Sequence, residues 1–129
     1  MRFLLMTMAF GALFAAVPAV AQGVRDNDRR LNAAEITDML SGRIVEFHDG
    51  SKSRYGADGS YAYTYADGEP PFVGAYTAGD DGRVCVSFEN GAARCDHYVM
   101  DGTRLILVIA DGTRFPVRSL TETPSEFAE

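Results

Sequence analysis

The sequence predicts an all-β fold, an eight-stranded antiparallel meander that forms a small up-and-down barrel or a sandwich, preceded by one short α-helix. The main observation is that Asp-Gly or Asn-Gly recurs seven times, at intervals of 9 to 14 residues. These dipeptides are the strongest short-range hairpin signal, because glycine adopts the left-handed backbone conformation freely and Asn or Asp tolerates it. The seven pairs are Asp49-Gly50, Asp58-Gly59, Asp67-Gly68, Asp81-Gly82, Asn90-Gly91, Asp101-Gly102 and Asp111-Gly112.

Seven turns separate eight strands of about six residues each. We expect these strands near residues 43–48, 51–56, 60–66, 71–78, 83–89, 92–99, 103–109 and 113–119. A closed barrel and a two-sheet sandwich both satisfy this pattern, and we favour the barrel. Pro116 lacks a backbone donor, which a sheet tolerates only at an edge or a bulge. We therefore expect imperfect closure between the first and the last strand.

The helix is predicted from Asn32 to Ser41. Asn32 is a suitable N-cap, and Glu35 follows at the spacing of a capping box. Gly42 ends the segment. The apolar positions at helical spacing are Ile36, Met39 and Leu40. This stripe is narrow, so the helix is expected to plug or flank the β-structure rather than form a core of its own.

The ends of the chain predict export. Residues 1–21 combine a positive start, an apolar run and a small-x-small cleavage site before Gln22, as a secretory signal peptide does. A transmembrane anchor, the alternative, needs about 20 apolar residues, and Pro18 interrupts this run. We expect a disordered leader at 22–30, a single β-rich domain at 31–120 and an acidic tail at 121–129, in a periplasmic or secreted protein without membrane insertion after cleavage.

Charge excludes polyanionic partners. Without Arg2 the chain keeps 11 of its 12 basic residues against 18 acidic ones, a formal net charge of −7. Binding to nucleic acid or anionic lipid depends on clustered Lys and Arg, which are scattered here. We therefore expect no nucleic-acid partner.

Cys85 and Cys95 are predicted to form a disulfide. A three-residue loop, with Gly91 in the left-handed position, makes Phe88 face Ala92 and places Cys85 directly opposite Cys95. The two residues then form a non-hydrogen-bonded pair, whose α-carbons approach to about 4.5 Å, within reach of a disulfide. Two free buried thiols and a redox-active pair are the alternatives.

One cluster is a hypothetical ligand site. Tyr61, Tyr63 and Tyr65 alternate along one strand and share a face, which indicates either core packing or a surface on which a ligand stacks. Arg94 and Asp96 share the apolar face of their hairpin with Val84, Val86 and Phe88. Either this face is the core and the two charges line a lumen, or the disulfide face packs inward. In the first case the charges and the tyrosines suit a small polar ligand.

Catalytic and metal-binding patterns are absent from the sequence. His48 and His97 have no third ligand at a spacing that fixes a metal site, and the acidic turns lack the spacing of a calcium loop. Motifs for serine hydrolases, zinc proteases and phosphate-binding loops are also missing. We expect no enzyme activity and no cofactor.

The pattern Leu31-Asn-Ala-Ala-Glu35-Ile36-x-x-x-Leu40-x-Gly42, followed by Asp-Gly hairpins and a cysteine-containing hairpin, resembles a set of small exported proteins of proteobacteria whose function is uncharacterised. In plan the chain is also similar to periplasmic inhibitors of metalloproteases, which combine an eight-stranded barrel, one disulfide and a polar N-terminal arm. The resemblance implies an exported location and this fold, but no activity. The absence of catalytic patterns favours a non-catalytic binding or envelope module with a protein or small-molecule partner in the cell envelope. The alternatives are a protease inhibitor acting through residues 22–30, a small-ligand-binding barrel, and a small enzyme using Arg94, Asp96 and the tyrosines.

Overall fold

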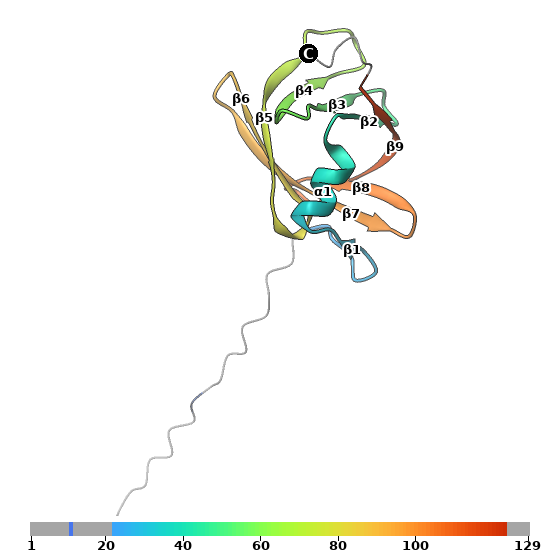
Figure 1. Cartoon of the computed structure of the whole chain (residues 1–129). Coiled ribbons are helices and arrows are strands. Elements are labelled where there is room, and N and C mark those ends of the chain that lie inside the picture. Colours follow the sequence, from blue (N-terminus) through green and yellow to red (C-terminus); the bar gives the residue numbers. More distant parts are fainter. Residues whose placement is uncertain (1–10, 12–21, 124–129) are drawn as a thin grey trace, which may run out of the picture.

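The strands follow one another around a barrel in the order of the predicted hairpins (Figure 1). The computed structural model describes Gly11 and residues 22–123. Within these residues the barrel consists of β2 (Arg43–Phe47), β3 (Lys52–Tyr55), β4 (Ser60–Thr64), β5 (Phe72–Ala78), β6 (Arg83–Phe88), β7 (Ala93–Asp101), β8 (Arg104–Val108) and β9 (Arg114–Glu122). Each strand pairs with the next in antiparallel orientation, and β9 also pairs with β2. The predicted eight-stranded meander is confirmed, and it is a closed barrel.

Closure between β2 and β9 contains one irregularity. The register shifts between Glu46, which faces Ser119, and Phe47, which faces Val117, so that Arg118 is the extra residue of a β-bulge. Pro116 lies just beyond it, paired with Ile106 of β8. β9 runs three residues beyond its predicted end, into the segment that we expected to be a tail. Residues 124–129 of that segment, and the predicted signal peptide apart from Gly11, lie outside the described residues.

The helix caps one end of the barrel. α1 (Ala33–Leu40) begins with the predicted capping box: Asn32 Oδ1 accepts from the Glu35 amide at 2.9 Å, and Glu35 Oε1 accepts from the Asn32 amide at 3.4 Å. Ile36 and Leu40 are fully buried in the core. α1 contacts β2, β5 and the 3-10 turn η1 (Asp80–Gly82), which joins β5 to β6. The helix therefore covers the end of the barrel at which β5 leads into β6.

The expectation of a disordered segment at residues 22–30 does not agree with the structure. β1 (Arg29–Arg30) pairs with Met100 and Val99 of β7. These residues follow His97, the last residue of β7 that pairs with β6. β7 is longer than β6, and β1 supplies partners for backbone groups that β6 leaves unpaired. Upstream of β1, the side chain of Asp28, only 1% exposed, binds Arg114 of β9 at 2.6 and 2.9 Å.

The same segment covers an apolar patch on the outside of the barrel. Val99, Ile106 and Val108 are almost fully buried although they point away from the lumen, and Val24 packs against them. Alternate residues of these strands, such as Tyr98 and Leu107, belong to the main core inside the barrel. An N-terminal segment can thus become ordered through contacts that its own composition does not reveal.

Candidate functional site

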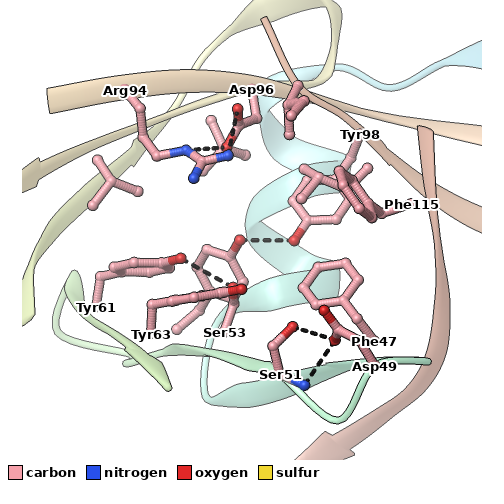
Figure 2. A pocket seen from close by; sticks show the side chains of 15 residues that line it. Phe47, Asp49, Ser51, Ser53, Tyr61, Tyr63, Arg94, Asp96, Tyr98 and Phe115 are labelled. Carbon is pink, nitrogen blue, oxygen red and sulfur yellow. Dashed lines mark hydrogen bonds and ion pairs between the residues drawn. The ribbon is translucent and has the colours of Figure 1, made fainter. Parts of the chain in front are cut away.

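The candidate site is a cavity at the end of the barrel opposite the helix. In an antiparallel meander, successive turns lie at opposite ends of the barrel. The cavity is lined by residues next to the β2–β3, β4–β5, β6–β7 and β8–β9 turns, which all lie at one end. α1 contacts the β5–β6 turn, which lies at the other end. The cavity has a volume of about 160 Å³ (Figure 2). Its lining comprises Phe47, Asp49, Ser51, Ser53, Tyr55, Tyr61, Tyr63, Val84, Val86, Arg94, Asp96, Tyr98, Leu107, Ile109 and Phe115.

The charged pair of β7 lies on the wall of this cavity. Val84 and Val86 point into the lumen, and Asp96 and Arg94 face them across the β6–β7 ladder. Of the two orientations open for this hairpin, the one with lumenal charges is therefore present. Arg94 donates from Nε to one oxygen of Asp96 at 2.9 Å and from Nη2 to the other at 3.1 Å. The side chain of Asp96 is 13% exposed and that of Arg94 46%.

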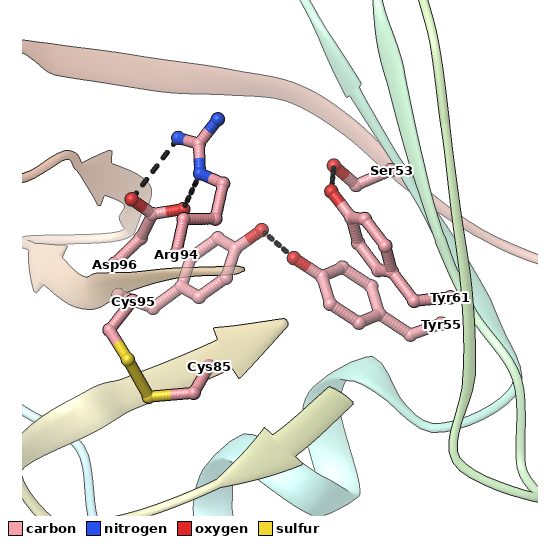
Figure 3. A network of polar contacts seen from close by, with 8 residues as sticks. Ser53, Tyr55, Tyr61, Cys85, Arg94, Cys95 and Asp96 are labelled. Atoms are coloured by element: carbon pink, nitrogen blue, oxygen red, sulfur yellow. Dashed lines mark hydrogen bonds and ion pairs between the residues drawn. A yellow bond between two sulfur atoms is a disulfide. The ribbon is translucent and has the colours of Figure 1, made fainter. Parts of the chain in front are cut away.

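Asp96 offsets the cost of burying the Arg94 charge. Burial alone lowers the pKa of the Arg94 guanidinium, but the hydrogen bonds and the charge of Asp96 outweigh it, and the pKa rises above its ordinary value. Residues two apart in a strand share one face, so both side chains leave β7 in the same direction. The result is a charged group held in a fixed orientation at the open end of the barrel (Figure 3).

Two pairs of hydroxyl groups lie deeper in the lumen. Tyr55 and Tyr98 share a hydrogen bond of 2.7 Å between their phenolic oxygens, and Ser53 and Tyr61 share one of 3.0 Å (Figure 3). Burial raises the pKa of the Tyr61 phenol to about 12 and raises those of Tyr55 and Tyr98 well above the ordinary value. The phenols are therefore neutral, and each hydrogen-bonded pair fixes ring positions in the wall.

The predicted site residues do not all meet. Tyr61, Tyr63, Arg94 and Asp96 line the cavity together, but Tyr65 does not, and its expected place in the site is not supported by the cavity geometry. β4 ends at Thr64, so strand alternation no longer directs the next side chain inward. Tyr65 is 51% exposed and packs edge-on against Tyr63 and Phe72, with ring centroids 4.9 and 6.0 Å apart. These three rings form an aromatic ledge beside the opening.

Several lining residues were missing from the sequence-based hypothesis although a signal existed. Tyr98 continues the inward alternation that begins with Arg94 and Asp96. Residues 51, 53 and 55 alternate along β3 and the residue before it, so they point to the same face of the sheet, and all three are at most 3% exposed. Serine at an inward position is a weak hydropathy signal, which is why this wall is recognised only once the register is known.

The β6–β7 hairpin has the predicted register and disulfide. Cys85 pairs with Cys95, their α-carbons lie 4.0 Å apart, and the two sulfurs are bonded on the outer side of the barrel (Figure 3). Phe88 faces Ala92, and Gly91 has φ of +90°. A structural disulfide indicates an oxidising, extracytoplasmic compartment.

The histidines lie away from the cavity. His48 is exposed in the β2–β3 turn, and His97 of β7 faces Arg83 of β6. Burial, followed by the charge of Arg83, lowers the pKa of His97 below its ordinary value. Within the described part of the chain, no three His, Cys, Asp or Glu side chains gather as metal ligands, and no helix is long and apolar enough to cross a membrane.

No family model, curated protein or solved structure matches this chain. The likeness to small exported proteins of proteobacteria and to periplasmic inhibitors stays a prediction. The evidence on function is the geometry of the cavity.

Proposed function

We propose that this protein is an exported, non-catalytic binding protein that holds a small organic molecule in the open end of its barrel. The observation that carries the proposal is the lumenal cavity, with aromatic walls and a fixed Arg94–Asp96 pair at its opening. Ligand sites typically combine apolar walls with a few oriented polar groups. An engineered cavity of about 150 Å³ binds benzene, so 160 Å³ suits one ring-sized group.

The lining supports binding rather than catalysis. The Ser51 hydroxyl donates to Asp49 at 2.6 Å, and that of Ser53 is paired with Tyr61. Neither histidine belongs to the lining, so neither serine has an imidazole base beside it. These contacts fix the wall and favour a receptor for a small molecule over a hydrolase.

The alternative of a protease inhibitor acting through residues 22–30 is less favoured. That segment is paired with β7 through Arg29 and Arg30 and bound to β9 through Asp28. It would have to leave both contacts before it could enter the cleft of a protease. Location in the periplasm or secretion, and removal of residues 1–21, are parts of the proposal supported by the disulfide.

The proposal is tested by titrating the disulfide-bonded protein with benzyl alcohol, a neutral ring-sized probe, and following backbone amide chemical shifts. We expect saturable changes at lumen-facing positions of β3, β4 and β7. Ser51→Phe places a ring in the cavity and should abolish them. Ser60→Phe is the matched control, because the Asp58-Gly59-Ser60 turn repeats the geometry of Asp49-Gly50-Ser51 outside the cavity. Absence of lumenal changes with any ring-sized probe, charged or neutral, would contradict the proposal.

A further inference from the structure

One edge of the Arg94 guanidinium is free. Arginine has five N–H donors in a planar fork. Asp96 uses the Nε donor and one donor of Nη2, and within residues 22–123 no acceptor is paired with Nη1. Nη1 and the second Nη2 donor together form the end-on edge of the group. Figure 2 shows the guanidinium on the side of the cavity opposite Ser51 and Asp49, with Tyr61 and Tyr63 between them.

The free edge has the geometry of a carboxylate receptor. Two parallel N–H donors match the two oxygens of a carboxylate, and such bidentate pairs are among the strongest hydrogen bonds in proteins. Asp96 compensates the charge of Arg94 and prevents the guanidinium from rotating, so the orientation is set before a ligand arrives. Within the site Asp96 is a positioning residue rather than a ligand contact.

The rest of the cavity suits an apolar body. Phe47 and Phe115 pack edge to face, with ring centroids 6.4 Å apart, on the wall away from Arg94. The aliphatic residues of the lining are Val84, Val86, Leu107 and Ile109. A ligand with a charged head and a ring-sized or branched body would place both ends against matching groups.

Asp49 is the second carboxylate of the lining, and it would attract a cation rather than an organic acid. Asp49 is exposed, and one of its oxygens accepts from both the amide and the hydroxyl of Ser51. Arg94 is also partly exposed, so water and salt screen both charges. An organic cation is therefore the competing ligand class that the experiment must separate.

We infer that the ligand is a small organic acid whose carboxylate binds the end-on edge of Arg94 and whose apolar body fills the aromatic part of the lumen. This inference rests on the proposed function, because it names the ligand class of the same cavity. It adds a chemical preference that a merely apolar cavity would not have.

Three probes of similar size and different charge test it: benzoate, benzyl alcohol and benzylamine, each titrated under the same conditions. We expect benzoate to bind most tightly, with the largest shift changes around Arg94, and its advantage to shrink as salt is added. If benzyl alcohol or benzylamine binds in the lumen as tightly as benzoate, the organic-acid inference is wrong while the proposed function stands. If none of the three binds there, the proposed function itself fails.

Substitutions of Arg94 test whether this residue causes the preference for benzoate. Arg94→Met should weaken benzoate binding about ten- to hundredfold, the value of a charge-assisted hydrogen bond, and leave benzyl alcohol binding nearly unchanged. Arg94→Lys keeps a partner for Asp96 but loses the planar fork, so it should lose most of the benzoate preference in a folded protein. Arg83→Met, on the outer face of the adjacent strand, is the control. Unchanged benzoate binding in Arg94→Lys and Arg94→Met would overturn the inference.

Discussion

The pair formed by Tyr55 and Tyr98 allows a quantitative test of the lumenal architecture. Their phenolic oxygens lie 2.7 Å apart, and the two residues are 3% and 0% exposed. Removal of one hydroxyl leaves the other without this partner in a place that water reaches poorly. An orphaned buried polar group costs about 1–3 kcal/mol. We therefore expect Tyr55→Phe and Tyr98→Phe each to lower the free energy of unfolding by about 1–3 kcal/mol.

The double variant separates this effect from loss of packing. In the double variant neither hydroxyl remains, so no polar group is left without a partner. The loss of unfolding free energy in Tyr55→Phe/Tyr98→Phe should therefore be no greater than that of the more destabilising single substitution. The coupling energy between the two sites should be about 1–2 kcal/mol. Denaturant titration of the oxidised protein at constant m-value is the measurement. Tyr65→Phe is the control, since that ring is half exposed on the ledge, and it should change stability by less than about 0.5 kcal/mol. Strictly additive single effects would refute the pairing of the two hydroxyls.

Titration at high pH examines the same phenols without mutation. Burial raises the pKa of Tyr61 to about 12 and raises those of Tyr55 and Tyr98 well above the ordinary value, so folding favours the neutral forms of all three. The resulting stability is complete below the ordinary tyrosine pKa of about 10 and is lost as pH rises through the folded values. Phenolate absorbance should show part of the six tyrosines ionising only together with unfolding. Reversible ionisation of all six in the folded protein would contradict this.

Three further perturbations have defined outcomes. Replacing Cys85 and Cys95 by Ala should lower the free energy of unfolding by about 2–3 kcal/mol, because the disulfide closes a short loop. Equal denaturation midpoints would show that the disulfide does not stabilise the fold. Leu40→Ala, at a fully buried position of α1, should cost about 2–5 kcal/mol, and a midpoint shift within error would mean that the helix does not hold the core. Asp28→Asn should reduce amide-exchange protection in β1 while the barrel stays protected, because it breaks the pair with Arg114. The hydrogen bonds from Arg114 lower the pKa of Asp28, so the same protection should be present above the ordinary Asp pKa of about 3.9 and disappear as pH falls through the folded value; protection that is independent of pH would exclude this pair as the cause.

The fold was predictable from sequence because its signals are local. Each Asx-Gly pair fixes a turn, and the turn at Asn90-Gly91 fixes the register that brings Cys85 opposite Cys95. Closure of the barrel and docking of residues 22–30 depend instead on strand lengths. That β7 extends past β6 and offers free backbone groups to β1 is a property of the assembled sheet. No periodicity within residues 22–30 contains that information.

The candidate site was predictable in part for the same reason. Alternation on the β6–β7 hairpin correctly grouped Arg94 and Asp96 with the apolar lumen face, once the hairpin register was known. The alternation of inward and outward side chains gave a wrong prediction for Tyr65. Side chains alternate only within a strand, and β4 ends one residue before Tyr65. The meeting of β4 with β7 across the lumen required closure of the barrel, which only the structure supplied.

The two ends of the barrel differ in a way that bears on function. Ile36 and Leu40 of α1, together with Leu31 just before the helix, fill one end with apolar side chains. At the other end β7 places an arginine and an aspartate at inward positions, where apolar residues of similar volume would stabilise a small domain at least as well. Arg94 is 46% exposed and its position is compatible with solvent contact, but folding alone does not require the Asp96 carboxylate, which is only 13% exposed. An oriented guanidinium with one edge free is of use to a molecule that enters the lumen, and the cavity beside it has the volume to hold one.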